Sequence, residues 1–160
     1  MRLDRRPLVT CLLAAAALCA ARCTGPQPQL VPLAMGPMDS FTRDVEPVLE
    51  SRCAQGSCHG RPGRSLALYA PGQHREDATR TYLAEPLSAE EIRVNAVSLA
   101  ILAEGAPPEQ CEALTKPLAI AAGGLWHGGG DVFVDTTDPG YRVMLAWLRA
   151  CVPPGDGGAP

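Results

Sequence analysis

Aromatic residues are scarce in this chain of 160 residues, where two Phe, two Trp and three Tyr make up 4% of the total. Glycine and proline, at 16 residues each, together account for 20%, against an average of about 12%. The length predicts one domain. A small, loop-rich domain with few large apolar side chains usually needs a covalent staple or a bound cofactor to stay folded. The composition therefore argues against a large enzyme, a collagen-like protein and a coiled coil.

The sequence also lacks any stretch approaching the ~20 consecutive apolar residues of a transmembrane helix. Its longest apolar run, residues 8–21, follows three arginines, and this pattern predicts a signal peptide over residues 1–21. Residues 22–38 contain four prolines and no apolar periodicity, so we expect a Pro-rich linker. Cys23 is a candidate lipid-attachment site, although Arg22 before it fits such sites poorly. We therefore expect a protein of the periplasm or cell envelope, either soluble or tethered through Cys23 as an outer- or inner-membrane lipoprotein.

An excess of positive charge is absent. Once residues 1–21 are removed, the 14 basic and 17 acidic residues fall to 11 and 16, and the formal charge becomes −5. This sign argues against nucleic acid or an anionic lipid surface as a partner. The triple glycine at 128–130 lacks the Gly-Lys-Ser/Thr of a phosphate loop. The aspartates at 131, 135 and 138 lack the spacing of a calcium loop. Since we also find no set of nucleophile, base and orienting acid, we expect no enzyme activity.

The domain is expected over residues 39–152, with a disordered tail at 153–160. Apolar residues recur at helical spacing in residues 41–53, with Asp44 as the expected N-cap and Pro47 in the first turn. A second helix is expected over residues 76–83, ending before Pro86.

Two further helices are expected towards the end of the domain. Ser88, followed by Glu90 and Glu91, is typical of a helix start, so a helix is expected to continue through residues 92–102, although its apolar spacing would also suit a strand. Residues 111–138 are expected to be irregular. The last helix, residues 139–151, should be capped by Asp138 and should bury one apolar face, formed by Tyr141, Met144, Leu145 and Leu148. The predicted fold class is therefore mostly α and loop-rich.

Seven cysteines are present, and two of them lie within residues 1–21. Those that remain in an exported chain are expected to be bridged, lipidated or used by a cofactor; they are Cys23, Cys53, Cys58, Cys111 and Cys151.

The segment Cys53-Ala-Gln-Gly-Ser-Cys58-His59 carries the strongest functional signal. Two thiols followed directly by an imidazole are typical of covalent c-type haem, in which the thiols form thioethers to the vinyl groups and the histidine binds the iron. The gap between the cysteines is four residues here, instead of the usual two. Two alternatives remain open: a small disulfide loop with an incidental histidine, and a zinc site completed by one more ligand. An oxidising compartment disfavours the zinc site.

The surroundings of this segment resemble a known family. Phe41-x-x-Asp44-Val45-x-Pro47-Val48-Leu49-x-x-x-Cys53, followed by Cys58-His59-Gly60, is similar to the first helix and attachment site of small bacterial cytochrome c domains. Further on, the chain resembles the closing half of cytochrome c-like domains of exported planctomycete and myxobacterial proteins, at residues 114–118, at His127-Gly128-Gly129 and at Tyr141 with Trp147. The resemblance implies a small helical domain around one covalent haem c, with Cys53 and Cys58 as thioether attachments and His59 as the proximal iron ligand.

An electron-transfer haem needs a sixth ligand from His or Met. We expect His127, because the following glycines remove side chains where the backbone would approach the flat macrocycle. The other candidates are His74, Met35, Met38 and Met144.

Three further side chains are candidate partners of the haem propionates, or else belong to a solvated face: Arg61, Arg64 and Lys116. Trp147 is expected in the core. Cys111 and Cys151 form the natural disulfide pair, which would close a loop of about 40 residues and stabilise the fold by about 3–4 kcal/mol.

The sequence therefore predicts an exported, monomeric electron carrier with one haem and an unidentified redox partner. Its rival is a haem-free structural or interaction module with Cys53–Cys58 and Cys111–Cys151 disulfides. A third alternative is a haem enzyme or gas sensor with His127 away from the iron.

Overall fold

The computed structural model describes residues 33–151. The predicted signal peptide, Cys23, most of the predicted linker and the tail at 153–160 lie outside the described residues. Within residues 33–151, no helix is long and apolar enough to cross a membrane.

The first helical run, residues 38–53, starts earlier than the sequence predicted. It consists of α2 (Met38–Ser40), a π-helical turn (Phe41–Val45), α3 (Glu46–Val48) and a second π-helical turn (Leu49–Cys53). The prediction of Asp44 as the N-cap is therefore wrong: Asp44 lies inside the run and pairs with Arg43. Pro47 lies in the middle of the run, at the start of α3 and between the two π turns, so its predicted place in the first turn of the run is also wrong.

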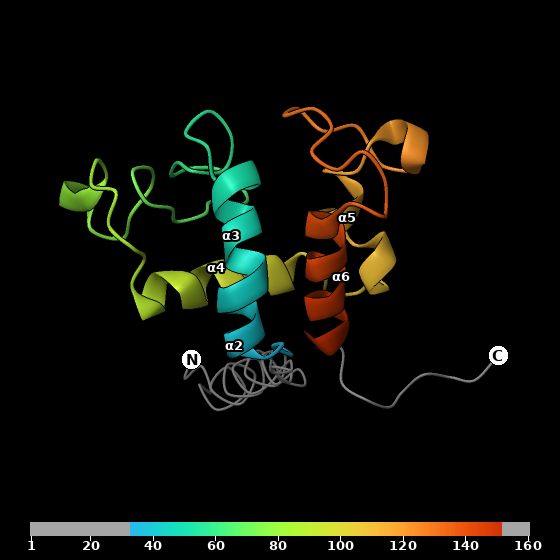
Figure 1. Cartoon of the computed structure of the whole chain (residues 1–160), viewed down its shortest axis with the longest axis horizontal. Helices are drawn as coiled ribbons and strands as arrows, with labels where there is room; N and C mark the ends of the chain where they lie inside the picture. The colour runs from blue at the N-terminus through green and yellow to red at the C-terminus, as the bar shows by residue number, and fades with distance from the viewer. Residues whose placement is uncertain (1–32, 152–160) are drawn as a thin grey trace, which may run out of the picture. The chain divides into compact units, whose positions relative to one another are not determined.

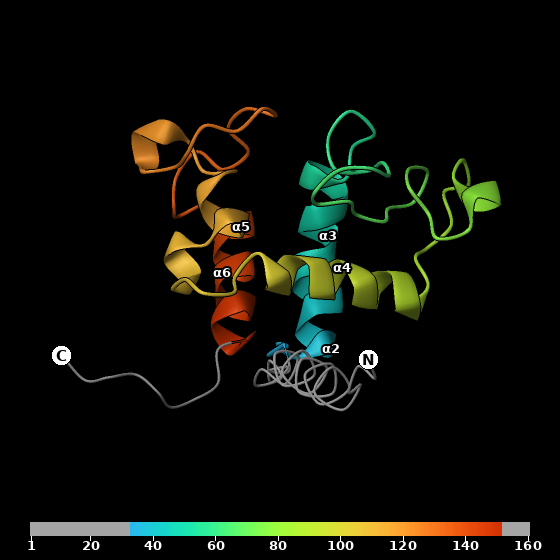
Figure 2. The same cartoon turned by 180° about the vertical axis from the view of Figure 1, so that it is seen from behind.

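The run buries one face, because Phe41, Val45 and Leu49 recur every four residues and are all at most 1% exposed. Figures 1 and 2 show α6 (Pro139–Cys151) beside this run and antiparallel to it. The ring centroids of Phe41 and Trp147 lie 4.9 Å apart at this contact. Trp147 is thus a core residue, as expected.

Helix α6 confirms its prediction. Asp138 Oδ1 accepts from the backbone N–H of Gly140 at 2.7 Å, and the Asp138 carbonyl accepts from that of Arg142 at 3.0 Å. The helix buries Tyr141, Met144, Trp147, Leu148 and Cys151.

Helix α4 (Ala89–Ile101) also confirms its prediction, and the strand alternative is wrong. Ser88 and Glu91 form a complete capping box at its start. In Figures 1 and 2 this helix crosses the first helical run, and its C-terminal end points towards α6.

The helix predicted over residues 76–83 is absent. Only one 3₁₀ turn forms there, Ala78–Arg80, begun by the Asp77 side chain accepting from the backbone N–H of Thr79. No residue of the turn is buried, so no apolar face exists to stabilise a longer helix.

Residues 111–138 are largely irregular, as predicted. They contain α5 (Glu112–Thr115), a 3₁₀ turn (Ile120–Ala122) and one isolated bridge between Leu118 and Phe133. The described residues therefore form a small, mostly helical domain.

The predicted Cys111–Cys151 disulfide is absent, and so is the Cys53–Cys58 disulfide of the rival interpretation, since the cysteines of the described residues are all free thiols. Cys111 and Cys151 are both buried, but each sulfur has its own surroundings. Backbone N–H groups of Ala113 and Leu114 lie near the Cys111 thiol, at the start of α5, and the N–H of Gly36 donates to Cys151 Sγ at 3.1 Å. The two sulfurs thus contact different parts of the backbone and are not bonded to each other.

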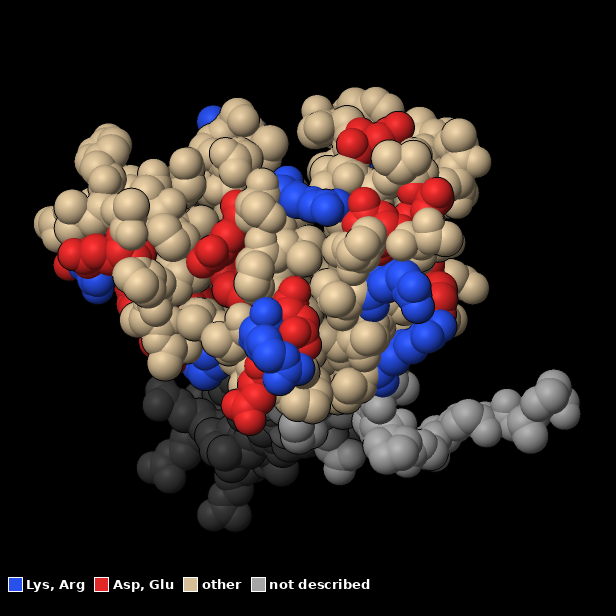
Figure 3. Space-filling model, in the orientation of Figure 1, with Lys and Arg blue, Asp and Glu red and all other residues tan. Residues whose placement is uncertain are grey.

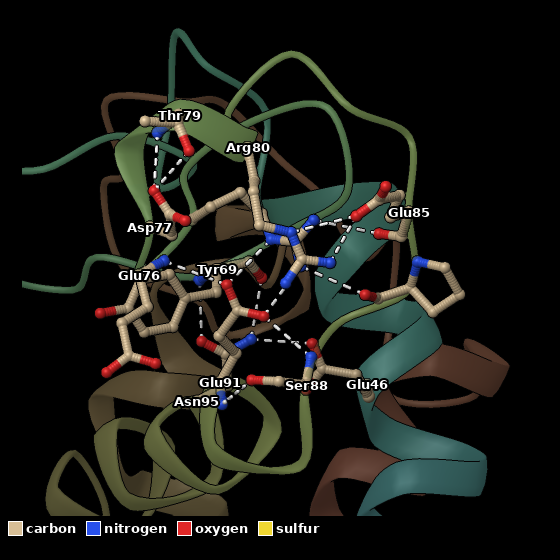
Figure 4. A network of polar contacts seen from close by, with 12 residues as sticks. Glu46, Tyr69, Glu76, Asp77, Thr79, Arg80, Glu85, Ser88, Glu91 and Asn95 are labelled. Atoms are coloured by element: carbon tan, nitrogen blue, oxygen red, sulfur yellow. Dashed lines mark hydrogen bonds and ion pairs between the residues drawn. The ribbon is translucent and has the colours of Figure 1, made fainter.

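A buried ion pair fastens residues 75–88 to α4. The side chains of Arg75 and Glu91 are 0% and 3% exposed, and Arg75 donates to both carboxylate oxygens, at 2.8 and 2.9 Å. Figure 4 shows Glu91 at the centre of the polar contacts in this region. The guanidinium also donates to the backbone carbonyls of Glu85 and Pro86. The hydrogen bonds from Arg75, together with backbone N–H groups, lower the pKa of Glu91 from 4.5 to about 2 despite its burial.

Candidate functional site: a cavity between two histidines

A cavity of about 220 Å³ lies where the first helical run, α4, α5 and α6 meet the irregular segments. All four predicted site residues line it: Cys53, Cys58, His59 and His127. Most of the remaining lining is apolar, including Leu49, Leu66, Leu99, Leu102, Val132 and Met144.

The end of the first helical run brings the two cysteines to the cavity. Cys53 is its last residue, and the chain then turns tightly, with the N–H of His59 donating to the Cys53 carbonyl at 3.1 Å. Gly60 is required in this turn, because a Cβ there would lie 2.0 Å from the carbonyl oxygen of Ala54. Residues 54–57 therefore form a compact loop, and a four-residue gap still returns Cys58 and His59 to the helix end.

Both thiols are free and half-buried. Burial raises the pKa of the Cys53 thiol to about 11, so the group is protonated at neutral pH.

His59 is oriented by the backbone. Its Nδ1 lies 2.8 Å from the carbonyl oxygen of Leu66. A carbonyl oxygen only accepts hydrogen bonds, so Nδ1 carries a proton, and in the neutral ring Nε2 keeps its lone pair. Metal-binding histidines are commonly oriented by such a bond.

His127 is held in the same way. Its Nδ1 lies 3.1 Å from the carbonyl oxygen of Gly130, which again leaves the lone pair on Nε2. Gly129 and Gly130 also have a local role, beside the predicted one of leaving room for a macrocycle. A Cβ at Gly129 would lie 3.1 Å from the His127 ring, and Gly130 has a φ of 79°, which favours glycine. They make room for the imidazole and for the turn that fixes it.

The two imidazole rings are almost parallel, with an interplanar angle of 7° and centroids 5.9 Å apart. Neither Nε2 makes a hydrogen bond within residues 33–151. Two oriented rings with free Nε2 atoms thus line one cavity.

Other predicted residues divide into two groups. Met144 and Lys116 line the cavity. The remaining candidates are not among its lining residues: His74, Arg61, Arg64, Met35 and Met38. Arg64 instead donates to the backbone carbonyls of Ser57 and Cys58, which stabilises the loop between the cysteines.

Sequence reasoning missed Arg52. It lines the cavity and donates to both carboxylate oxygens of Asp138 at 2.9 Å. Lys116 similarly pairs with Glu112 at 2.7 Å. The cavity's basic groups thus have acidic partners, and Figure 3 shows basic and acidic side chains intermingled on one face of the molecule.

In the described part of the chain, no group of three or more His, Cys, Asp or Glu side chains is arranged to hold a metal ion by itself. The zinc alternative gains no support from these residues. Comparisons with models of known families, with curated proteins and with solved structures found no match to this chain.

Proposed function

We propose that this protein is an exported c-type cytochrome that carries electrons through one covalent haem. The observation that carries the proposal is the parallel pair of His59 and His127, each with Nδ1 bonded to a backbone carbonyl and Nε2 free. Cys53 and Cys58 would attach the haem through thioethers, His59 would be the proximal ligand and His127 the distal ligand. When bound, the haem supplies a one-electron couple between ferrous and ferric iron.

The spacing of the histidines fits this group. Two imidazoles on opposite sides of one iron have centroids about 6 Å apart, because each metal–nitrogen bond is about 2 Å long and each ring centre lies about 1 Å beyond its nitrogen. The centroid distance of 5.9 Å and the interplanar angle of 7° are compatible with that geometry. Two imidazoles that only stack on each other would have a similar distance and angle. We favour the ligand role because both rings line one cavity and neither Nε2 is hydrogen-bonded within the described residues.

The cavity's lining also supports the proposal. Its volume of about 220 Å³ is below the ~300–1,000 Å³ of most ligand pockets, so a haem held between the histidines would extend beyond the cavity into solvent. The apolar side chains would exclude water from the iron, and Lys116 is the predicted propionate partner that lines the cavity. The protein's part is to hold the iron between two fixed ligands, which suits electron transfer without a chemical transformation.

The rival, a disulfide-stapled module, requires bonds between cysteines that are free thiols in the structure. Export to the periplasm or envelope, attachment through Cys23, a monomeric state and an unidentified redox partner remain parts of the proposal.

Mass spectrometry of the denatured chain tests covalent attachment. The protein should be expressed with a haem-maturation system, alongside a Cys53→Ala/Cys58→Ala variant and a Cys111→Ala control. We expect the unmodified protein and the control to retain the mass of one haem, and the double variant to lose it. An unmodified protein without added mass would contradict the proposal.

A further inference from the structure

A fully buried asparagine connects α4 to the segment that orients His59. Asn95 is 0% exposed, and its side chain bonds both backbone groups of Tyr69: Oδ1 accepts from the N–H at 2.8 Å and Nδ2 donates to the carbonyl at 2.9 Å. Figure 4 shows this pair of bonds. Asn95 thus satisfies both backbone groups of Tyr69, as a neighbouring β-strand does, and holds this part of residues 66–70 against α4.

The other end of the same segment holds His59. The Leu66 carbonyl accepts from His59 Nδ1 at 2.8 Å, and the N–H of Leu68 donates to the His59 carbonyl at 2.8 Å. Leu68 is 0% exposed between these contacts. A shift of this short, partly buried segment would therefore move the oxygen that orients the imidazole.

Asn95 also contacts a buried carboxyl group on the first helical run. Its Nδ2 donates to Glu46 Oε1 at 2.8 Å, and Glu46 is 4% exposed. Glu46 Oε2 has no hydrogen-bond partner among the described residues. One oxygen of the carboxyl group is thus bonded to Asn95, and the other is free to carry a proton.

We infer that Asn95 is a positioning residue for His59, and that Glu46, acting through Asn95, makes the reduction potential of the site depend on pH. The inference rests on the proposed function, because the potential belongs to the haem. The hydrogen bond to His59 Nδ1 makes the imidazole a stronger electron donor, which stabilises the oxidised iron. Loss of the Asn95 clamp should weaken that bond and raise the potential.

The pH dependence arises from the environment of Glu46. Burial raises its pKa to about 7, partly offset by the hydrogen bond from Asn95. Two groups act on this carboxyl: Asn95 on α4, whose hydrogen bond lowers the pKa, and Glu50, one turn along the first helical run, whose charge raises it. As pH rises through about 7, the carboxylate forms and its negative charge favours the oxidised, more positive iron. The potential should therefore fall over this interval.

Redox titration of the haem-loaded protein between pH 5.5 and 8.5 tests this inference. Glu46→Gln keeps an acceptor for Asn95 but carries no charge, so we expect its potential to match that of the unmodified protein at pH 5.5 and to exceed it at pH 8.5. Glu50→Gln is the matched control, because it removes a neighbouring carboxylate that does not bond Asn95; it should keep the fall in potential and move it only slightly to lower pH, since the charge of Glu50 raises the pKa of Glu46. A Glu46→Gln variant with an unchanged pH dependence would overturn the role of Glu46.

The role of Asn95 has a readout that does not need haem. In the ¹⁵N NMR spectrum of the folded, haem-free chain, we expect the His59 Nδ1–H to exchange about fivefold faster in Asn95→Ala, as loss of one hydrogen bond implies. Arg93→Gln, an exposed change on the same helix, should leave the exchange unaltered. Unchanged exchange in a folded Asn95→Ala variant would overturn the positioning role. If Asn95→Ala does not fold, Asn95→Asp answers the same question, since it keeps the acceptor for Tyr69 but loses both donated bonds. Failure to bind haem would leave this readout intact, so the two proposals fail separately.

Discussion

The buried Arg75–Glu91 pair allows a quantitative prediction about the stability of the domain. Glu91→Gln keeps the shape of the side chain and its ability to complete the capping box, but removes the charge opposite a guanidinium that is 0% exposed. Breaking a buried ion pair costs about 3–5 kcal/mol, because the remaining charge has no partner. We therefore expect the free energy of unfolding at pH 7 to fall by about 3 kcal/mol, as measured by urea denaturation.

The pH dependence of this effect has a definite sign. The pKa of Glu91 is lowered from 4.5 to about 2 in the folded chain, which corresponds to about 3 kcal/mol of stabilisation by the charged form. Because the folded pKa lies below the unfolded one, this stabilisation is complete above the unfolded value. It is lost as pH falls from about 4.5 towards 2. The difference between the unmodified protein and Glu91→Gln should shrink over that interval.

Glu90→Gln is the matched control, since it neutralises the preceding glutamate, which pairs with Arg93 in solvent with both side chains about half exposed. Exposed pairs contribute little to stability. Equal unfolding curves for Glu90→Gln and Glu91→Gln at pH 7 would refute the reasoning, as would a destabilisation by Glu91→Gln that does not change between pH 7 and pH 2.

Three other predictions concern the site. Gly60→Ala should lower the haem content, measured as the ratio of Soret to 280 nm absorbance, because the new Cβ would lie 2.0 Å from a backbone oxygen; an unchanged ratio would contradict the close approach. His127→Ala should convert a low-spin absorption spectrum to a high-spin one, while His74→Ala, outside the cavity lining, should not; low-spin spectra from both variants would rule out His127 as the ligand. In the haem-free chain, unfolded without reductant, Cys111 and Cys151 should both react with iodoacetamide, since both are free thiols. If they react only after reductant is added, the two cysteines form a disulfide and the free thiols of the structure are wrong.

Elements with strong local signals were predictable from the sequence. The capping box at Ser88 and Glu91 marks the start of α4, and Asp138 with Pro139 marks that of α6. The prediction of a helix over residues 76–83 was wrong, because the turn that forms there buries no residue and so lacks the packing that stabilises a longer helix. The start of the first helical run was misplaced because its first buried residue, Phe41, comes before the expected cap.

The site was predictable where its residues are neighbours in the chain. Cys53, Cys58 and His59 form one motif, and the glycines after His127 singled it out. The oxygen that orients His59 belongs to the backbone of Leu66, and no side-chain pattern reports such a contact. Arg52 and Asp138 are 86 residues apart, so only the fold shows that they pair.

The absorption spectrum of the purified chain, expressed with a haem-maturation system, tests the central claim most directly. We predict a Soret band and the sharp visible bands of a low-spin haem when the protein is reduced, with His59 and His127 as the ligands. A folded protein without a Soret band would contradict the claim that the cavity between these two histidines holds a haem.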